Sequence, residues 1–549
     1  MKKYVIGIDF GSLSARATLV STQDGRELAS SEYAYPHAVM NEADICGGVP
    51  LDTTALQHPD DYLEALSTVT RGVISSSGVS PSEIGALAID FTSSSILPVK
   101  ADGTPICSLE SFSAEPHAYV KMWKHHGAIA EAERITEVAN ERFPELIEPY
   151  SGVYSCEWFL AKIYETLNKA PAVYSAADLF LEAGDWIAMM LTGRVVRSAC
   201  HAGYKSMWNE RDGYPPEAYF AAVDKRLTHV VSEKMGGEVK PIGAEAGPMN
   251  ERGAALTGLP VGTPVSVALI DAHAALPAVG VVNPGDMAII FGTSACHLVI
   301  WDKDVRVEGI CGKVLGGVMP GYMAYEAGQA AAGDTLSWVV NRCTPPSYAA
   351  EAEARGISIY DLLTEGAAKM KIGESGLIAL DWWNGCRTPY VDDELTGVIV
   401  GLTLATTPEA IFRATVESLA FGTKRIVDEY ERAGIQIGKI VIGGGIAKKN
   451  PFIMQVLSDV LGHELYASML TQAGAHGSAI YAALTSGEYD SLADAVSAMA
   501  STDTVRYSPT PGATEKYAKL YRDFIELSEY FHSRNSVMKR LKMYAKGDI

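Results

Sequence analysis

Short apolar runs separated by tight turns open the chain, and they predict strands that follow one another closely. Val5 to Phe10 is a mostly apolar run, Gly11-Ser12 predicts a turn, and Ala15 to Val20 predicts a second strand. Asp24-Gly25 then predicts a turn into a third strand, Arg26 to Ser30, because Asp-Gly is a strong hairpin signal. We therefore expect the chain to begin with a hairpin that continues into a third strand.

Further along, the pattern mixes strands with amphipathic helices. The run from Glu83 to Asp90 predicts a strand that ends on a carboxylate, and helical spacing is found around 158–167 and 185–191. Strands that alternate with helices of this kind indicate an α/β architecture.

The opening pattern recurs in the second half of the chain. Residues 10–16 (FGSLSAR) resemble residues 291–297 (FGTSACH), and the strand at 84–90 has a counterpart at 437–443. This order indicates one α/β unit used twice, although short patterns of apolar residues and glycine also recur by chance. The loop-like stretch at 279–285 marks the expected boundary.

Length and charge narrow the class of protein. A chain of 549 residues is too long for one compact core, so we expect domains at 1–279 and 280–530, followed by a basic, solvated tail at 531–549. The formal net charge of −21 argues against binding to nucleic acid, which depends on clustered Lys and Arg. The chain has no long apolar stretch that predicts a membrane span. Its 8 cysteines are scattered without a C-x-x-C pair, which indicates reduced thiols and a cytoplasmic protein.

The first turn carries chemistry that suits a phosphate and a metal ion. Gly11 allows backbone N–H groups to approach phosphate oxygens, and Ser12, Ser14 and Arg16 add donors. Asp9, at the end of the first strand, could hold Mg²⁺, which prefers oxygen ligands. The alternative is a plain hairpin with a surface arginine.

Two glycine turns in the second half offer related chemistry without the carboxylate. Gly292 and Thr293 repeat the phosphate-facing turn, but Ile290 stands where Asp9 stood. Gly443, Gly444 and Gly445 follow a strand and leave backbone open to a flat ring or a phosphate; a flexible loop is the alternative. The spacing of these glycines does not fit a dinucleotide-binding fingerprint.

Asp271 follows six mostly apolar residues, where a carboxylate could accept a proton from an attacking hydroxyl. Its alternative role is that of a helix N-cap, because the residues Ala-His-Ala-Ala-Leu come next. The chain has no P-loop motif, and Asp9-Phe10-Gly11 lacks the catalytic-loop H-R-D of protein kinases.

Together these motifs resemble the FGGY carbohydrate kinases of the actin and Hsp70 superfamily, over roughly residues 3 to 530. Residues 7–16 look like the family's first phosphate loop, 257–272 like the approach to its catalytic base, and 292–294 like its second phosphate loop. Residues 443–451, which include Asn450, look like the adenosine loop. Residues 472–479 (QAGAHGSA) resemble the late family signature, with His476 where a small residue is usual.

The resemblance implies a two-lobed, actin-like (ribonuclease H-like) fold with the active site in the cleft between the lobes. It implies ATP and Mg²⁺ as cofactors, Asp271 as the base, and a homodimer as a possible assembly. Segments 90–94, 116–126 and 326–334 resemble kinases that phosphorylate L-ribulose at its 5-hydroxyl in L-arabinose breakdown. By that likeness Ser93, Lys205, Asp271 and Glu326 hold the sugar, although Lys205 and Glu326 could instead form salt bridges; His117 and His273 stay unassigned.

Two alternatives to this function stay open. The first is an FGGY kinase for another polyol, such as xylulose, xylitol or erythritol. The second is a non-catalytic ATP-binding protein of the same fold, which would need no base at Asp271.

Overall fold

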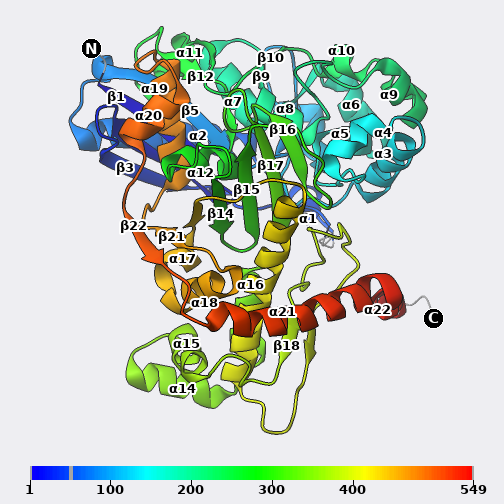
Figure 1. Cartoon of the computed structure of the whole chain (residues 1–549). Coiled ribbons are helices and arrows are strands. Elements are labelled where there is room, and N and C mark those ends of the chain that lie inside the picture. Colours follow the sequence, from blue (N-terminus) through cyan, green and yellow to red (C-terminus); the bar gives the residue numbers. More distant parts are fainter. Residues whose placement is uncertain (1–2, 49–52, 547–549) are drawn as a thin grey trace. The chain divides into compact units, whose positions relative to one another are not determined.

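The structure, a computed structural model, describes residues 3–48 and 53–546 (Figure 1). The chain divides into two compact units. Unit 1 consists of Met1–Val282, Lys313–Ala324 and Gln472–Ser501, and unit 2 consists of Asn283–Gly312, Tyr325–Thr471 and Thr502–Ile549. The second domain expected from the sequence, 280–530, includes residues 472–501, which cluster with unit 1.

A mixed sheet forms the centre of unit 1, with strands in the order β11-β12-β5-β1-β2-β3 and β13 beside β5. β1 pairs antiparallel with β2 and parallel with β5, and β2 pairs antiparallel with β3. The three predicted opening strands are thereby confirmed. The strands are β1 (Tyr4–Phe10), β2 (Ser14–Ser21), β3 (Glu27–Ala34), β5 (Ile84–Phe91), β11 (Glu245–Pro248), β12 (Pro264–Ser266) and β13 (Leu269–Ile270).

Helices cover both faces of this sheet. Successive side chains of a strand point to opposite faces. Phe10 meets Tyr62 of α2 (Pro59–Ser77) at a ring-centroid distance of 6.2 Å. On the other face, a Cβ added to Gly7 would lie 1.9 Å from the backbone oxygen of Ala475 in α19 (Ala473–Thr485). α19 therefore packs directly on β1 because Gly7 has no side chain.

A second layer of unit 1 is built on a four-stranded sheet in the order β4-β7-β6-β8, and it has its own apolar core. Its strands are β4 (Leu56–Gln57), β6 (Ile96–Val99), β7 (Val120–Lys121) and β8 (Leu179–Glu182). The predicted helices around 158–167 and 185–191 are confirmed as α5 and α7. The helices of unit 1 that matter below are α5 (Phe159–Lys169), α7 (Ala183–Thr192), α8 (Ala199–Lys205), α12 (Asp271–Ala278) and α20 (Leu492–Met499).

The sheet of unit 2 repeats the plan of unit 1, in the order β17-β15-β14-β20-β21-β22. β14 pairs antiparallel with β15 and parallel with β20, as β1 does with β2 and β5. β20 continues parallel to β21, and β21 antiparallel to β22, which matches β5, β12 and β11. The predicted duplication is confirmed. The strands are β14 (Met287–Phe291), β15 (Ala295–Trp301), β17 (Met323–Gln329), β20 (Ile440–Gly443), β21 (Leu465–Ser468) and β22 (Thr504–Tyr507).

Helices complete unit 2, and the longest of them, α16, runs through its centre in Figure 1. The elements are α13 (Gly333–Arg342), α14 (Pro346–Arg355), α15 (Ile359–Lys369), β18 (Ile378–Leu380), β19 (Val398–Val400), α16 (Pro408–Arg432), α17 (Gly445–Lys449), α18 (Pro451–Leu461), α21 (Ala513–Glu529), the π-helical turn η7 (Tyr530–Arg534) and α22 (Val537–Lys546).

The tail differs from the expectation of a solvated segment. Residues 537–546 form helix α22, and Met538 on it is 4% exposed. Lys539 Nζ lies 2.8 Å from Asp392 Oδ2, and the same helix exposes Leu541 and Tyr544. One buried methionine and polar contacts of Lys539 and Lys542 fix the helix, and none of them is visible as a periodic pattern in the sequence. Residues 547–549 of the expected tail lie outside the described residues.

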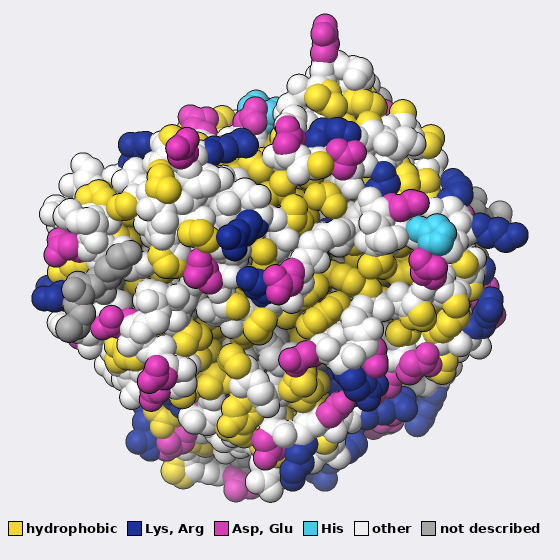
Figure 2. Space-filling view, turned by 90° about the horizontal axis from the view of Figure 1, so that it is seen from above, with side chains coloured by type: hydrophobic (Ala, Val, Ile, Leu, Met, Phe, Trp, Pro, Cys, Tyr) yellow, Lys and Arg dark blue, Asp and Glu magenta, His cyan; other side chains and the backbone are white. Residues whose placement is uncertain are grey.

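Among the described residues, no helix is long and apolar enough to cross a membrane. On the face that Figure 2 shows, acidic and basic side chains are interspersed over the described surface. The net charge of −21 is therefore not concentrated there as a patch of one sign.

Candidate active site

Three carboxylates meet at one edge of the unit 1 sheet because of strand register. Asp9 near the end of β1 is the direct neighbour of Asp90 near the end of β5. β13 lies on the other side of β5, with Leu269 opposite Asp90 and Ile270 opposite Phe91. Asp271 is the next residue. Since the carboxyl ends of parallel strands lie at the same edge of a sheet, Asp9, Asp90 and Asp271 face one region.

Burial changes the acid strength of this group. Asp90 is fully buried, and its pKa lies well above the ordinary value because of burial and the neighbouring charge of Asp9. Ser478 of α19 donates to Asp90 Oδ2 at 2.7 Å, which opposes that rise. The pKa of Asp9 is also raised, mainly by burial. Two adjacent carboxylates that cannot both be charged easily gain from a cation.

The pair fits a hard metal ion. Asp90 Oδ1 is buried without a hydrogen-bond partner in the described part of the chain, and Asp9 lies beside it in register. Mg²⁺ is commonly held by one or two carboxylates, with the remaining positions filled by water and substrate phosphate oxygens. The predicted ligand Asp9 thus lies beside Asp90, for which the sequence predicted only a position at the end of a strand. The shared pattern of an apolar strand ending on Asp could have identified it.

The predicted first phosphate loop is a turn with several internal contacts. The Gly11 N–H donates to the Ser14 carbonyl at 3.0 Å, and Trp123 Nε1 donates to Ser12 Oγ at 3.0 Å. Ser14 Oγ and Arg16 Nε both donate to Glu32 Oε1, at 2.9 and 3.1 Å. Arg16 Nη1 also lies 3.9 Å from Asp9 Oδ2, and its side chain is 40% exposed. Their contact with phosphate stays a prediction.

The late signature at 472–479 forms the start of α19, and its glycines permit close packing. A Cβ on Gly477 would lie 1.7 Å from the carbonyl oxygen of Ala274 in α12, so the two helices touch through backbone. His476 Nδ1 lies 3.2 Å from Glu27 Oε1, and its Nε2 lies 2.8 Å from the Met499 carbonyl oxygen. The unusual histidine therefore ties α19 to β3 and α20.

Asp271 is the first residue of α12, and Ile270 occupies the N-cap position. Asp271 is therefore not itself the N-cap residue of this helix. Asp271 Oδ1 accepts the N–H of Ala272 at 2.7 Å, and the residue is half-buried. A carboxylate in a first helical turn is stabilised by the helix dipole. The role of Asp271 as the base that accepts the hydroxyl proton stays a prediction.

Two predicted sugar ligands, Ser93 and Lys205, also belong to unit 1. Ser93 Oγ is buried without a hydrogen-bond partner in the described chain, and the next residue, Ser94, has a φ of +58°. Lys162 Nζ donates to the Ser94 carbonyl at 2.6 Å and holds this strained turn. Lys205, at the end of α8, is 6% exposed and lies over the Trp158 ring, 5.3 Å from its centroid.

Two further residues near Lys205 were missed by sequence reasoning. His201, one turn before Lys205 on α8, is 1% exposed, and neither ring nitrogen has a hydrogen-bond partner in the described chain. Burial and the charge of Lys205 lower the pKa of His201 to about 3, so the ring is neutral. Glu182 at the end of β8 is 3% exposed with both oxygens unpartnered, and burial raises its pKa to about 8. A histidine four residues before the predicted lysine was the available signal.

The second predicted phosphate turn, at Gly292 and Thr293 in unit 2, is held by backbone hydrogen bonds. The Gly333 N–H donates to the Gly292 carbonyl at 2.9 Å, and the Ala332 N–H donates to the Thr293 carbonyl at 2.8 Å. The start of α13 therefore fixes the turn, and Thr293 is exposed. Glu326, the fourth predicted sugar ligand, is half-buried on β17 in this unit.

The three predicted adenosine-loop glycines differ in what they require. Gly444 has a φ of +103°, and a Cβ there would lie 2.3 Å from the Phe291 carbonyl oxygen, whereas a Cβ on Gly445 would meet nothing within 4 Å. Gly443 ends β20 beside Ile290. Asn450 caps α18 through its Oδ1 and donates from Nδ2 to Thr364 Oγ1 at 2.8 Å. Its amide therefore has a structural role, and its contact with a nucleotide stays a prediction.

This duplicated fold and the motifs on it define the class of protein. The model of the FGGY family of carbohydrate kinases, N-terminal domain, matches residues 4–278, and that of the C-terminal domain matches residues 287–486. The chain belongs to the FGGY family of carbohydrate kinases, as its motifs predicted.

Individual relatives show which members of the family the chain resembles in sequence and in fold. The chain is 43% identical over 547 residues to a protein named Ribulokinase from Geobacillus thermodenitrificans, covering 98% of this chain and 97% of that protein. It is 44% identical over 535 residues to a Ribulokinase from Bacillus licheniformis, covering 96% of this chain and 97% of that protein. The fold is shared with xylulose kinase from Rhodospirillum rubrum, with a TM-score of 0.76 and 23% identity over 96% of this chain and 99% of that one.

Proposed function

We propose that this protein transfers the γ-phosphoryl group of ATP to the 5-hydroxyl of L-ribulose, in the cytoplasm, as a step of L-arabinose breakdown. The products are ribulose 5-phosphate and ADP. The observation that carries the proposal is the meeting of Asp9, Asp90 and Asp271 at one sheet edge, in a chain 43% identical to a protein named Ribulokinase.

Asp271 accepts the proton of the 5-hydroxyl as that oxygen attacks the phosphoryl group. Lys205 and Ser93 hold the sugar, together with Glu326, and His201 adds one donor and one acceptor. Because the His201 ring is neutral, it can bind a hydroxyl without attracting an anion to the site. The buried positions of Lys205 and His201 keep water away from the bound sugar.

The nucleotide is assigned to the turns that resemble the family's loops. Gly11, Ser12, Ser14 and Arg16 are assigned to the phosphates, as are Gly292 and Thr293. Gly443, Gly444, Gly445 and Asn450 lie along the adenosine. Asp9 and Asp90 hold Mg²⁺, which when bound neutralises charge on the phosphate oxygens. We also propose a homodimer as the assembly.

A coupled ADP-release assay tests the proposal with Mg·ATP and L-ribulose, D-ribulose, L- and D-xylulose, xylitol, erythritol and glycerol. We expect the highest kcat/KM for L-ribulose. Turnover of xylulose, xylitol or erythritol alone would keep the kinase and reject the assigned sugar. Binding of ATP without turnover of any polyol would instead favour the non-catalytic alternative.

A further inference from the structure

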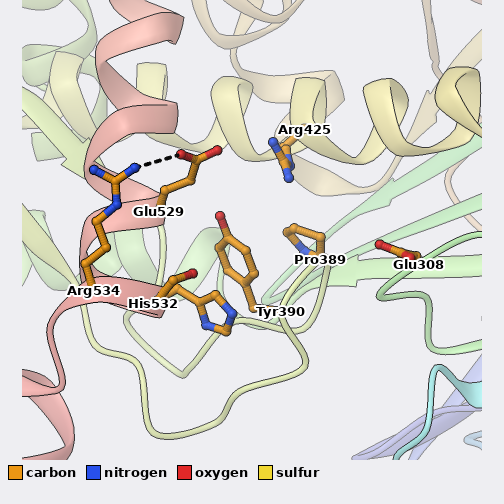
Figure 3. Close-up of a pocket in the computed structure, with 8 residues that line it drawn as sticks. Glu308, Pro389, Tyr390, Arg425, Glu529, His532 and Arg534 are labelled. Atoms are coloured by element: carbon orange, nitrogen blue, oxygen red, sulfur yellow. Dashed lines mark ion pairs between the residues drawn. The ribbon is translucent and has the colours of Figure 1, made fainter.

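A polar cavity lies within unit 2, where the C-terminal segment meets the loop after β18 and helix α16. Its volume is about 460 Å³, which is within the range of small-molecule sites. The lining residues are Glu308, Pro389, Tyr390, Arg425, Glu529, His532, Ser533 and Arg534. None of these residues is assigned above to the sugar or to the nucleotide. Figure 3 shows Arg425 pointing from α16 toward the Tyr390 hydroxyl, with Glu308 and Glu529 on opposite sides.

Three polar atoms in this cavity are buried and unpaired. Arg425 Nε, Tyr390 Oη and His532 Nδ1 have no hydrogen-bond partner within the described residues. Tyr390 and His532 stack at a ring-centroid distance of 3.9 Å and an interplanar angle of 15°, so each ring fixes the other. A buried polar atom without a partner is costly, and native proteins rarely keep three together unless something binds there.

The charged residues that line the cavity indicate that a neutral ligand fits better than an ion. Two arginines and two glutamates line it, so their formal charges cancel. Arg425 Nη2 already lies 2.9 Å from Glu429 Oε1, and Arg534 Nη2 lies 4.0 Å from Glu529 Oε2. Burial lowers the pKa of His532, so the ring is neutral, although Asp392 lies 3.9 Å from Nδ1. An anion would meet Glu308 and Glu529, and a cation would meet Arg425 and Arg534.

Hydroxyl groups suit all of these partners at once. A hydroxyl can accept from Arg425 Nε and donate to Glu308 or Glu529, while Tyr390 Oη can act in either sense. The rings of Pro389 and Tyr390 offer apolar surface for the C–H groups of a sugar carbon chain. We propose that this cavity is a second binding site, in unit 2, for a small neutral polyhydroxy compound of pentose size.

The bound compound joins three segments that are far apart in the sequence. Tyr390 belongs to the loop after β18, Arg425 to α16, and His532 to the π-helical turn η7. π-Helical turns are rare and occur frequently at functional sites. Occupancy therefore holds the C-terminal segment against α16, and it raises the thermal unfolding temperature of the full chain.

Calorimetric titration of the full chain with L-ribulose, without ATP, tests the proposal. We expect two equivalents bound by the unaltered chain and one by Lys205→Met. We also expect one equivalent for the double variant Tyr390→Phe, Arg425→Lys, which removes the hydroxyl and Nε but keeps the ring stack and the positive charge. Tyr530→Phe, adjacent on η7 but outside the cavity, is the matched control and retains two. Tyr390→Phe alone should weaken the second site about tenfold.

The outcomes separate this proposal from the proposed function. A single equivalent that Lys205→Met abolishes and the double variant keeps would overturn the second site and leave the kinase assignment intact. A single equivalent that the double variant abolishes and Lys205→Met keeps would support the cavity and count against the assigned sugar site. Ribitol, inorganic phosphate and glycine are then titrated into Lys205→Met. Binding of ribitol supports the class of ligand, whereas binding of phosphate or glycine alone, or of none, overturns it.

Discussion

The two central sheets share one topology but differ at the same point. In unit 1, Asp9 and Asp90 are neighbours near the ends of β1 and β5; in unit 2 the corresponding neighbours on β14 and β20 are Ile290 and Gly443. The first edge gathers charge, which suits a metal ion and a base. The second carries no carboxylate, and Gly443 leaves no side chain there. Duplication thus supplied two equivalent edges, and a few side chains at each decide its chemistry.

The largest expected effect is at Asp271. Asp271→Asn keeps the shape and the first-turn position but cannot accept a proton, so we expect kcat to fall by about 10²–10⁴. Steady-state kinetics with L-ribulose measure it, and the thermal unfolding temperature controls for folding. A kcat within a few-fold of the unaltered chain would remove Asp271 from the role of base.

Asp9 tests the difference between the two edges directly. Asp9→Asn should lower kcat by roughly 10- to 100-fold, on the scale of a lost charge-assisted contact, and raise the Mg²⁺ concentration needed for half-maximal rate. The matched change in unit 2, Ile290→Val, should leave both within about twofold. Equal losses in the two variants would mean that the edges do not differ in function.

Gly444 and Gly445, which follow β20, provide a matched pair of variants for a test of stability. Gly444→Ala forces a positive φ and a contact 2.3 Å from the Phe291 carbonyl oxygen, so we expect a loss of about 1–3 kcal/mol in the free energy of unfolding. Gly445→Ala meets nothing within 4 Å and should change it by less than about 0.5 kcal/mol. Denaturant titration of both variants measures the difference, and similar losses would contradict the assigned geometry.

His201 can be compared with His297, a buried histidine on β15 of unit 2. His201→Ala should raise KM for L-ribulose about tenfold, the scale of one hydrogen bond, and change kcat less. His297, whose Nε2 lies 3.2 Å from Thr423 Oγ1, is the control: His297→Ala should lower thermal stability and leave KM unchanged. A KM effect at His297 but none at His201 would reverse the assignment.

A last prediction concerns the dependence of stability on pH. Burial raises the pKa of Glu182 to about 8, so the folded chain holds a proton that the unfolded chain releases above its ordinary pKa. Its contribution to stability is complete at low pH and is lost as pH rises through 8. Glu182→Gln should therefore reduce the fall in stability between pH 5 and 7, by up to about 1 kcal/mol per pH unit.

Denaturant titration across that pH range measures the slope. Burial also raises the pKa of Asp185, to about 7, so Asp185 likewise makes the stability fall as pH rises. Part of the slope therefore remains in Glu182→Gln. The exposed Glu251→Gln should leave the slope unchanged. An unchanged slope in Glu182→Gln would mean that Glu182 is ionised in the folded chain.

Local pattern was enough to predict the repeated strands, because apolar alternation and glycine turns are short-range signals. The same signals predicted Asp9 and Asp271, each next to an apolar run. They did not predict that Asp90 joins Asp9, because that depends on the parallel register of strands 80 residues apart. Nor did they reveal His201 and Glu182, whose importance comes from burial without a partner. The helix in the tail was missed because a buried methionine and polar contacts of Lys539 and Lys542 hold it, and none of these gives a periodic pattern.

The packing of α19 on β1 also bears on how the chain is made. β1 ends at residue 10, whereas the helix that covers one of its faces begins at residue 473. A ribosome must therefore synthesise most of the protein before unit 1 can close, and contacts of such long sequence separation slow folding. Until then the backbone at Gly7 faces no partner from α19. A nascent chain released before residue 485 would lack part of this cover, so late truncation damages the first unit as well as the second.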